Sequence, residues 1–470
     1  MLRCNPMRWT IALLLVTICT GCAPFIQHRT QYELCINPTP VPLPGCETHA
    51  LQQFSTADGA SYLLGFIELD DQGQLWDRKQ MHSVMNKLLP ESGENDLLMA
   101  VFVHGWKHSA APNDGNIKTF RKVLAGLSEG ELHISQKNNR PARKVVGIYI
   151  GWRGGSVTVP FAEDLTFWER KNTAQKVGRG GVTEVLSQLE SLKRAKDSQQ
   201  KDKEASERKE ENDCEQKNKR VSEEKNMRSG TRLVIVGHSF GGAIVYSSLV
   251  QILQSRFVQT TGPDGTSSDA EHFGNLVVLI NPAVEALQFA PLSDMSTEQG
   301  YYFEQQLPIL AVLTSEADNA TRYAFPVGRN MSTLFENDRY IKRTNRASGR
   351  EEIEIIHEGQ ANVTAIGHFY PYQTHKLYPS SEVTQETAAL LSSSESVRSA
   401  CAVRRAWEKD HSGSRIPIAG LMLERTATSA GRNPYLVIKV DKRLITGHNN
   451  IDGDHIIEFL KQFILMSTLP

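Results

Sequence analysis

LVIVGHSFGGA, residues 233–243, is the stretch that decides how this chain folds. It opens with aliphatic and β-branched residues typical of a buried strand, and a helix-like run follows at 243–254. At the junction of the strand and the helix, Ser239 lies two residues after Gly237 and two residues before Gly241. A serine at so sharp a turn takes strained backbone angles, so the residues two positions away must be nearly free of side chain. This G-x-S-x-G context predicts a nucleophilic serine, whereas the pattern alone also fits a glycine-rich turn with a surface serine.

Short apolar runs with the same strand bias recur on both sides of this elbow. They lie at 63–69, 97–103, 145–150, 276–280, 309–313 and 435–440. Helical patterns separate them, among them 78–89 and a last helix at 456–464. Strands that alternate with helices predict βα units and a parallel sheet covered on both faces.

This layout resembles the α/β-hydrolase superfamily over roughly residues 95–330 and 430–470, with the elbow near the middle and a histidine-bearing loop before the last helix. The resemblance implies an α/β-hydrolase fold over 61–470, with a mostly parallel central sheet flanked by helices. It also implies a carboxylesterase-like or lipase-like serine hydrolase that cleaves ester or related acyl bonds through an acyl-enzyme on Ser239. An acyltransferase of the same fold and a non-catalytic binding module of the cell envelope are the alternatives.

A serine hydroxyl needs a base to take its proton, and the base needs a carboxylate to hold its tautomer. The superfamily order is serine, acid, histidine, with the histidine after the last strand. His448 fits that position, and His455 is the alternative. Asp318 follows the strand predicted at 309–313, which is the place the superfamily uses for the acid. Glu316 and Glu285 are the alternatives.

The tetrahedral intermediate of such a reaction carries an oxyanion, which needs two fixed N–H donors. Phe240 directly follows the nucleophile, so its backbone N–H is the first expected donor. The second is expected from the loop after strand 97–103, where His104-Gly105 resembles the HG motif of the superfamily. Gly105 lets the backbone turn inward, and Trp106 is the expected donor.

The N-terminus reads as a signal peptide at 1–21, because two arginines precede an apolar run too short to span a bilayer as a permanent helix. Small residues before Cys22 resemble the lipobox of bacterial lipoproteins, although Cys19 stands where that family usually has leucine. The resemblance implies lipidation of Cys22 and a place at the bacterial cell envelope. No aspartate follows Cys22, which favours the periplasmic face of the outer membrane over the inner membrane. Ordinary secretion, or a membrane-anchored or cytoplasmic protein, is the alternative.

The seven cysteines and the charge limit the other classes of function. Cys35 and Cys46 flank a proline-rich loop and could form a disulfide in an oxidising periplasm, with two free thiols as the alternative. No cysteine or histidine spacing suggests a metal site, and no glycine-rich loop follows a strand to bind a cofactor. A net charge of −1 gives no field that favours nucleic acid. The expected partners are a small-molecule or lipid acyl substrate and, through the N-terminal lipid, the membrane.

Three further segments are expected outside the core. Residues 22–60 read as a tether and entry segment. Residues 193–229 carry mixed charge with almost no apolar stripe, so they predict a solvated helix or a disordered excursion that points away from the core. Residues 328–431 read as a cap-like insertion.

Several aromatic and histidine side chains have structural as well as functional interpretations. His368 and His375 lie in the cap-like insertion and, like His238 in the elbow, are expected to pack rather than catalyse. Residues 166–179, with Phe167 and Trp168, fit either a lid or a surface helix with packed aromatic rings.

Overall fold

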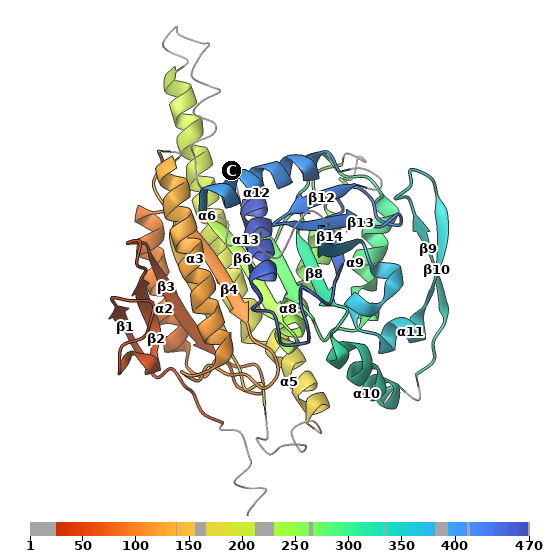
Figure 1. Cartoon of the computed structure of the whole chain (residues 1–470), viewed down its shortest axis with the longest axis horizontal. Helices are drawn as coiled ribbons and strands as arrows, with labels where there is room; N and C mark the ends of the chain where they lie inside the picture. The colour runs from red at the N-terminus through yellow and green to blue at the C-terminus, as the bar shows by residue number, and fades with distance from the viewer. Residues whose placement is uncertain are drawn as a thin grey trace, which may run out of the picture.

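The computed structural model describes residues 25–137, 139–155, 166–211, 230–262, 267–333, 336–380, 393–410 and 414–468. Twelve of the described strands form one sheet in the order β1-β2-β3-β5-β4-β6-β7-β8-β14-β11-β13-β12. Neighbours from β3 through β11 pair in parallel. Antiparallel pairs join β2 to β3 at one end and β13 to β11 and β12 at the other. The molecule is therefore α/β, with the large and mostly parallel sheet that the sequence predicts (Figure 1).

The elements of the fold have the following bounds. The strands are β1 (Gln31–Asn37), β2 (His49–Ser55), β3 (Ser61–Glu68), β4 (Leu97–Val103), β5 (Lys144–Gly151), β6 (Arg232–His238), β7 (Leu276–Ile280), β8 (Leu310–Ser315), β9 (Tyr340–Asn345), β10 (Glu352–His357), β11 (His375–Pro379), β12 (Arg415–Ile418), β13 (Leu421–Arg425) and β14 (Tyr435–Val440). The helices are α2 (Arg78–Glu94), α3 (Gly115–Lys137), α5 (Phe167–Arg179), α6 (Gly181–Glu211), α8 (Phe240–Val258), α9 (Ala286–Gln299), α10 (Phe325–Ser332), α11 (Glu358–Val363), α12 (Ser393–Glu408) and α13 (Asp454–Thr468).

Helices cover both faces of the sheet because its strands are apolar on both sides. Along β4, Met99 and Val101 pack with the core beneath α2, α5, α6, α8 and α9. Ala100 and Phe102 point the other way, into the core beneath α3. Further along the sheet α12 and α13 cover that second face. This period of two in a strand buried on both faces is what the continuous apolar runs predict.

In the described part of residues 22–60, for which the sequence predicts a tether and entry segment, the chain forms two strands of the main sheet. β1 and β2 add to the sheet beyond β3, and the Phe54 ring of β2 stacks on Tyr62 of β3 with 5.2 Å between centroids. The physical reason is that β2 buries its apolar side chains, Ala50, Leu51 and Phe54, when it pairs with β3.

The cap-like insertion 328–431 also differs from the prediction, because only its first part lies outside the sheet. β9 and β10 form a separate two-stranded ribbon, followed by α11 and two short helical turns. From His375 onward the chain re-enters the main sheet: β11 pairs in parallel with β14, and β13 and β12 extend the sheet outward. The second part of the insertion therefore extends the core.

The charged segment 193–229 begins as a helix. α6 runs to Glu211 and projects beyond the body of the molecule in Figure 1, as the lack of an apolar stripe predicts. The remainder of this segment, 212–229, lies outside the described residues.

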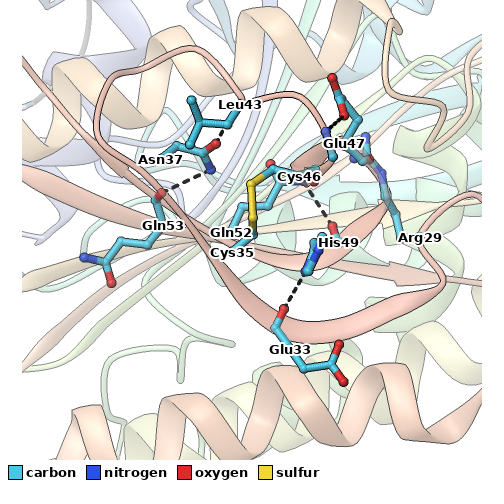
Figure 2. The surroundings of a disulfide bond; sticks show 11 residues. Arg29, Glu33, Cys35, Asn37, Leu43, Cys46, Glu47, His49, Gln52 and Gln53 are labelled. Carbon is cyan, nitrogen blue, oxygen red and sulfur yellow. Dashed lines mark hydrogen bonds between the residues drawn. A yellow bond between two sulfur atoms is a disulfide. The ribbon is translucent and has the colours of Figure 1, made fainter.

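A disulfide joins Cys35 of β1 to Cys46, with 5.7 Å between the Cα atoms (Figure 2). It closes the proline-rich loop, as the sequence predicts. Asn37 also holds this loop: its Oδ1 accepts from the Leu43 N–H at 2.7 Å and its Nδ2 donates to Gln53 O at 3.3 Å. The outermost strand of the sheet is thus fixed covalently to the segment that leads into β2.

Removing this disulfide is expected to lower the free energy of unfolding. The two cysteines are 11 residues apart, and closing a loop of that length in the unfolded chain corresponds to about 3 kcal/mol. The variant Cys35→Ser/Cys46→Ala is compared with the wild type by denaturant unfolding, with and without a reductant. The reductant should destabilise the wild type and leave the variant unchanged; equal stability of both proteins without reductant would contradict the prediction.

Candidate active site

The turn at Ser239 joins the end of β6 to the start of α8 and is strained. Ser239 has φ 56° and ψ −120°, a backbone conformation rare for a residue with a side chain. A Cβ atom at Gly241 would lie 2.0 Å from the carbonyl oxygen of Val103, so this position requires glycine. The Ser239 N–H donates to Ile280 O of β7 at 2.9 Å. The elbow is therefore fixed by β4 and β7, the two strands that flank β6.

Three side chains from different loops form one chain of hydrogen bonds. The Ser239 Oγ lies 2.7 Å from His448 Nε2, and His448 Nδ1 lies 2.8 Å from Asp318 Oδ1. A carboxylate only accepts, so His448 Nδ1 carries the proton and the unprotonated Nε2 accepts from the serine hydroxyl. These loops follow β6, β14 and β8, whose carboxyl ends meet at one edge of the parallel sheet. The structure thus brings the three predicted residues together.

The alternatives for acid and base lie elsewhere. Glu316 pairs with Lys439, with 2.8 Å between Oε1 and Nζ. Glu285 is buried and forms an ion pair with the Lys171 ammonium of α5. His455 lies in the first turn of α13 and, among the described residues, makes no hydrogen bond to the serine or the acid.

Asp318 is fully buried, at 0 % exposure, yet it stays ionised. Burial by itself would raise the pKa of this carboxyl, but hydrogen bonds from His448 and from Thr321 outweigh it and hold the pKa below its usual range. Thr321 donates twice: its N–H to Oδ1 at 3.1 Å, and its hydroxyl to Oδ2 through a short contact. A buried negative charge therefore faces the histidine.

Two donors that are not part of the Ser239–His448–Asp318 hydrogen bonds hold the backbone of His448. His238 Nε2 and Asn281 Nδ2 both lie 2.9 Å from His448 O, and a carbonyl only accepts, so both donate. Asn281 Oδ1 in turn accepts from the Ser315 N–H at 2.9 Å. His238 therefore packs as predicted and also positions the loop. Sequence reasoning missed Asn281 and Thr321; their only signals are that Asn281 ends a strand and that Thr321 follows Asp318 by one helical turn.

Hydrogen bonds in the loop after β4 fix the direction of one of the predicted oxyanion donors. His104 Nε2 accepts from the Trp152 N–H at 3.0 Å, so its Nδ1 carries a proton and donates to Gly105 O at 2.9 Å. In a trans peptide the C=O and the following N–H point in opposite directions. The Trp106 N–H is therefore directed away from His104, while the next amide, of Lys107, donates to Gly154 O at 3.2 Å.

The predicted donors also lie next to the serine. A Cβ atom at Gly105 would be 2.7 Å from the Ser239 Cβ, so only glycine lets the loop approach this closely. Phe240 is the first residue of α8, and an α-helix leaves the N–H groups of its first turn without intrahelical partners. Both predicted amides thus belong to segments that touch Ser239.

Aromatic rings pack beside these two amides. The Phe167 ring of α5 contacts Phe240, with 4.8 Å between centroids, and Trp106, with 5.3 Å. The buried pair between Lys171 of α5 and Glu285 fixes this helix to the loop after β7. Of the two interpretations of 166–179, the contacts of its described part favour a packed helix that forms a wall of the site.

No group of three His, Cys, Asp or Glu side chains that could hold a metal ion occurs in the part of the chain that the structure describes. Searches against protein-family models, curated proteins and solved structures found no match.

Acid is expected to destabilise the protein from about pH 6.5 downward. Burial lowers the pKa of His104 to about 4 and that of His238 to about 3, so both stay neutral in the folded state. Between pH 6.5 and about 4 the unfolded chain takes up protons that the folded chain does not. Stability is full above pH 6.5, and each histidine removes up to about 1.4 kcal/mol per pH unit below it.

His238→Gln keeps an N–H donor and removes one titrating ring, so the free energy of unfolding should fall less steeply with acid. Urea unfolding between pH 7.5 and 4.5 measures this slope. The exposed His82→Gln serves as control and should leave the slope unchanged. A His238→Gln slope equal to that of the wild type would show that His238 is not a buried neutral group.

Proposed function

We propose that this chain is a serine hydrolase of α/β-hydrolase fold that cleaves ester or related acyl bonds through an acyl-enzyme on Ser239. The observation that supports the proposal is the hydrogen-bonded chain from Ser239 through His448 to Asp318, with the protons placed as general-base catalysis requires. The strained elbow and the adjacent backbone amides give further support.

In this mechanism Ser239 Oγ attacks the acyl carbon while His448 Nε2 takes the hydroxyl proton. The imidazolium that forms is stabilised by the Asp318 carboxylate, which remains ionised. The N–H groups of Phe240 and Trp106 bind the oxyanion of the tetrahedral intermediate. His448 then gives its proton to the leaving oxygen, the bond to the leaving group breaks, and the acyl group stays on the serine.

The second half of the reaction repeats these steps with water. His448 takes a proton from water, the hydroxide attacks the acyl-enzyme, and the carboxylic acid leaves as Ser239 regains its proton. An alcohol or amine in place of water would make the same site an acyltransferase. The partly buried rings of Trp106 and Phe167 lie beside the proposed oxyanion donors and favour an apolar acyl group.

We also propose that the protein is a lipoprotein anchored through Cys22 at the periplasmic face of the outer membrane. Residues 1–24 lie outside the described residues, and none of the described helices is long and apolar enough to cross a membrane. The described chain begins near the edge of the sheet that carries Ser239: the N–H groups of His28 and Arg29 donate to the Glu68 carboxylate at the end of β3. Cys22 is three residues from Phe25, at most about 11 Å, so its lipid would hold this edge near the bilayer.

Ser239→Ala and His448→Ala are each expected to lower the rate of ester hydrolysis by about 10⁴-fold or more, because the nucleophile and base act as a unit. Asp318→Asn should lower it by about 10⁴-fold, since it favours the wrong histidine tautomer. Initial rates with p-nitrophenyl esters of increasing chain length measure these losses and the acyl preference together.

Glu316→Gln is the matched control for the acid and should keep wild-type activity, because Glu316 pairs with Lys439. A fluorophosphonate probe should label the wild type and not Ser239→Ala. Folded wild-type protein that hydrolyses no ester and takes no label would contradict the hydrolase and leave the envelope binding module.

Cys22→Ser is expected to abolish palmitate labelling and to release the protein from the membrane fraction, while leaving hydrolysis of a soluble ester unchanged. Metabolic labelling followed by fractionation measures both effects. The expected mature N-terminus is a lipidated Cys22. Mass spectrometry that finds any other mature N-terminus would rule out the lipoprotein.

A further inference from the structure

The acid of the candidate site has a second partner that the triad does not use. Asp318 Oδ1 accepts from His448, while Oδ2 accepts from the Thr321 hydroxyl through a short contact. Thr321 lies in the short π-helical turn Ala320–Ala324 and is itself buried, at 1 % exposure. Both carboxylate oxygens of the acid are therefore held by protein donors.

The Thr321 hydroxyl contacts a second histidine. Its Oγ1 lies 3.0 Å from His368 Nε2. A threonine hydroxyl has one proton, and here that proton goes to the carboxylate, so the contact to His368 must be donated by the histidine. His368 thus carries its proton on Nε2, and the hydrogen bonds run without a break from His368 through Thr321 and Asp318 to His448 and Ser239.

The segment that carries His368 is fixed to the core from two sides. On one side, the Ile366 N–H donates to Val284 O at 2.9 Å, and the Ala286 N–H donates to Thr364 O at 2.8 Å. On the other side, Gln373 Nε2 donates to Gly367 O at 2.9 Å. The imidazole is therefore presented to Thr321 by ordered backbone rather than by a free loop.

His368 is a neutral donor at neutral pH. Burial lowers its pKa to about 4, although the nearby Asp318 charge acts in the opposite direction. The other charged groups that face it are Arg322 from the same turn as Thr321 and Lys439 from β14, and both lower the pKa further. The donor therefore holds the acid without adding a positive charge that would oppose the imidazolium on His448.

We propose that Thr321 and His368 are positioning residues that hold Asp318 in the orientation in which it receives His448. This inference rests on the proposed hydrolase function. The role differs from general support of the fold, because the hydroxyl and the imidazole N–H act in series on one carboxylate oxygen. Loss of either should weaken the hold on Oδ2, while the Thr321 N–H still binds Oδ1, so the carboxylate is oriented less firmly toward the histidine.

Thr321→Val keeps the side-chain volume and removes the hydroxyl, and His368→Phe removes the ring N–H. Each is expected to lower kcat for a p-nitrophenyl ester about tenfold with KM within about twofold. Thr321→Val loses a hydrogen bond to the charged acid directly, and His368→Phe loses the donor that orients the hydroxyl in that bond. Thr321→Ser and His368→Gln return a hydroxyl and an N–H donor, and should recover most of the wild-type kcat.

Thr314→Val is the matched control, because Thr314 is a buried residue of β8 whose hydroxyl has no hydrogen-bond partner among the described residues. It should keep wild-type kcat. Wild-type kcat in both Thr321→Val and His368→Phe would overturn the inference, and so would losses that serine and glutamine fail to recover. Should Thr321→Val not fold, the His368→Phe and His368→Gln pair decides by the same criteria.

The activity of the variants separates the positioning role of Thr321 and His368 from the hydrolase function itself. Activity that disappears in Ser239→Ala but persists in the Thr321 and His368 variants contradicts only the positioning role. Activity that persists in Ser239→Ala contradicts the hydrolase itself, and with it the positioning role.

Discussion

The strained backbone of Ser239 is the constraint on which the rest of the site depends. A non-glycine residue at φ 56° and ψ −120° costs on the order of 1–3 kcal/mol, and it persists only where the surroundings leave no other conformation. Here β6 and α8 fix the two ends of the turn, Ile280 O binds its N–H, and glycine at 241 admits the carbonyl of Val103. These four core elements, β4, β6, β7 and α8, hold the buried Ser239 hydroxyl against His448.

A second constraint is the buried charge of Asp318. An ionised carboxylate in the core is tolerated only with enough donors, and this one receives donors from Thr321 and His448. The requirement explains why the chain turns sharply after β8, because the turn brings the Thr321 N–H and hydroxyl back onto the carboxylate. The geometry of the acid is therefore decided by the residues directly after it as much as by the strand before it.

The sequence predicts the central sheet and the three residues of the candidate triad, because both follow from local patterns in fixed order. Apolar runs mark β4, β6 and β7, and polar residues directly after such strands must meet at one edge of a parallel sheet.

The outer strands could not be predicted in the same way. β2 carries Gln52 and Gln53 among its apolar residues, and β11 begins with a buried histidine, so neither has a clear strand pattern. Whether these segments form strands depends on the neighbouring strand with which they pair, and no local sequence signal identifies that neighbour. The contact between Thr321 and His368 likewise joins segments 47 residues apart, across the β9–β10 ribbon.

Both histidines that support the candidate triad from outside act as neutral donors. His238 donates to the carbonyl of His448 and His368 donates to Thr321, and burial keeps each uncharged at neutral pH. Lysine or arginine in either place would put a fixed positive charge within the same buried region. In the proposed mechanism, that charge would oppose the imidazolium that forms on His448 when it takes the serine proton. An uncharged imidazole, like the amide of Asn281, fixes the loops without adding a charge. The Asp318 carboxylate is then the group that would stabilise the imidazolium of the proposed mechanism.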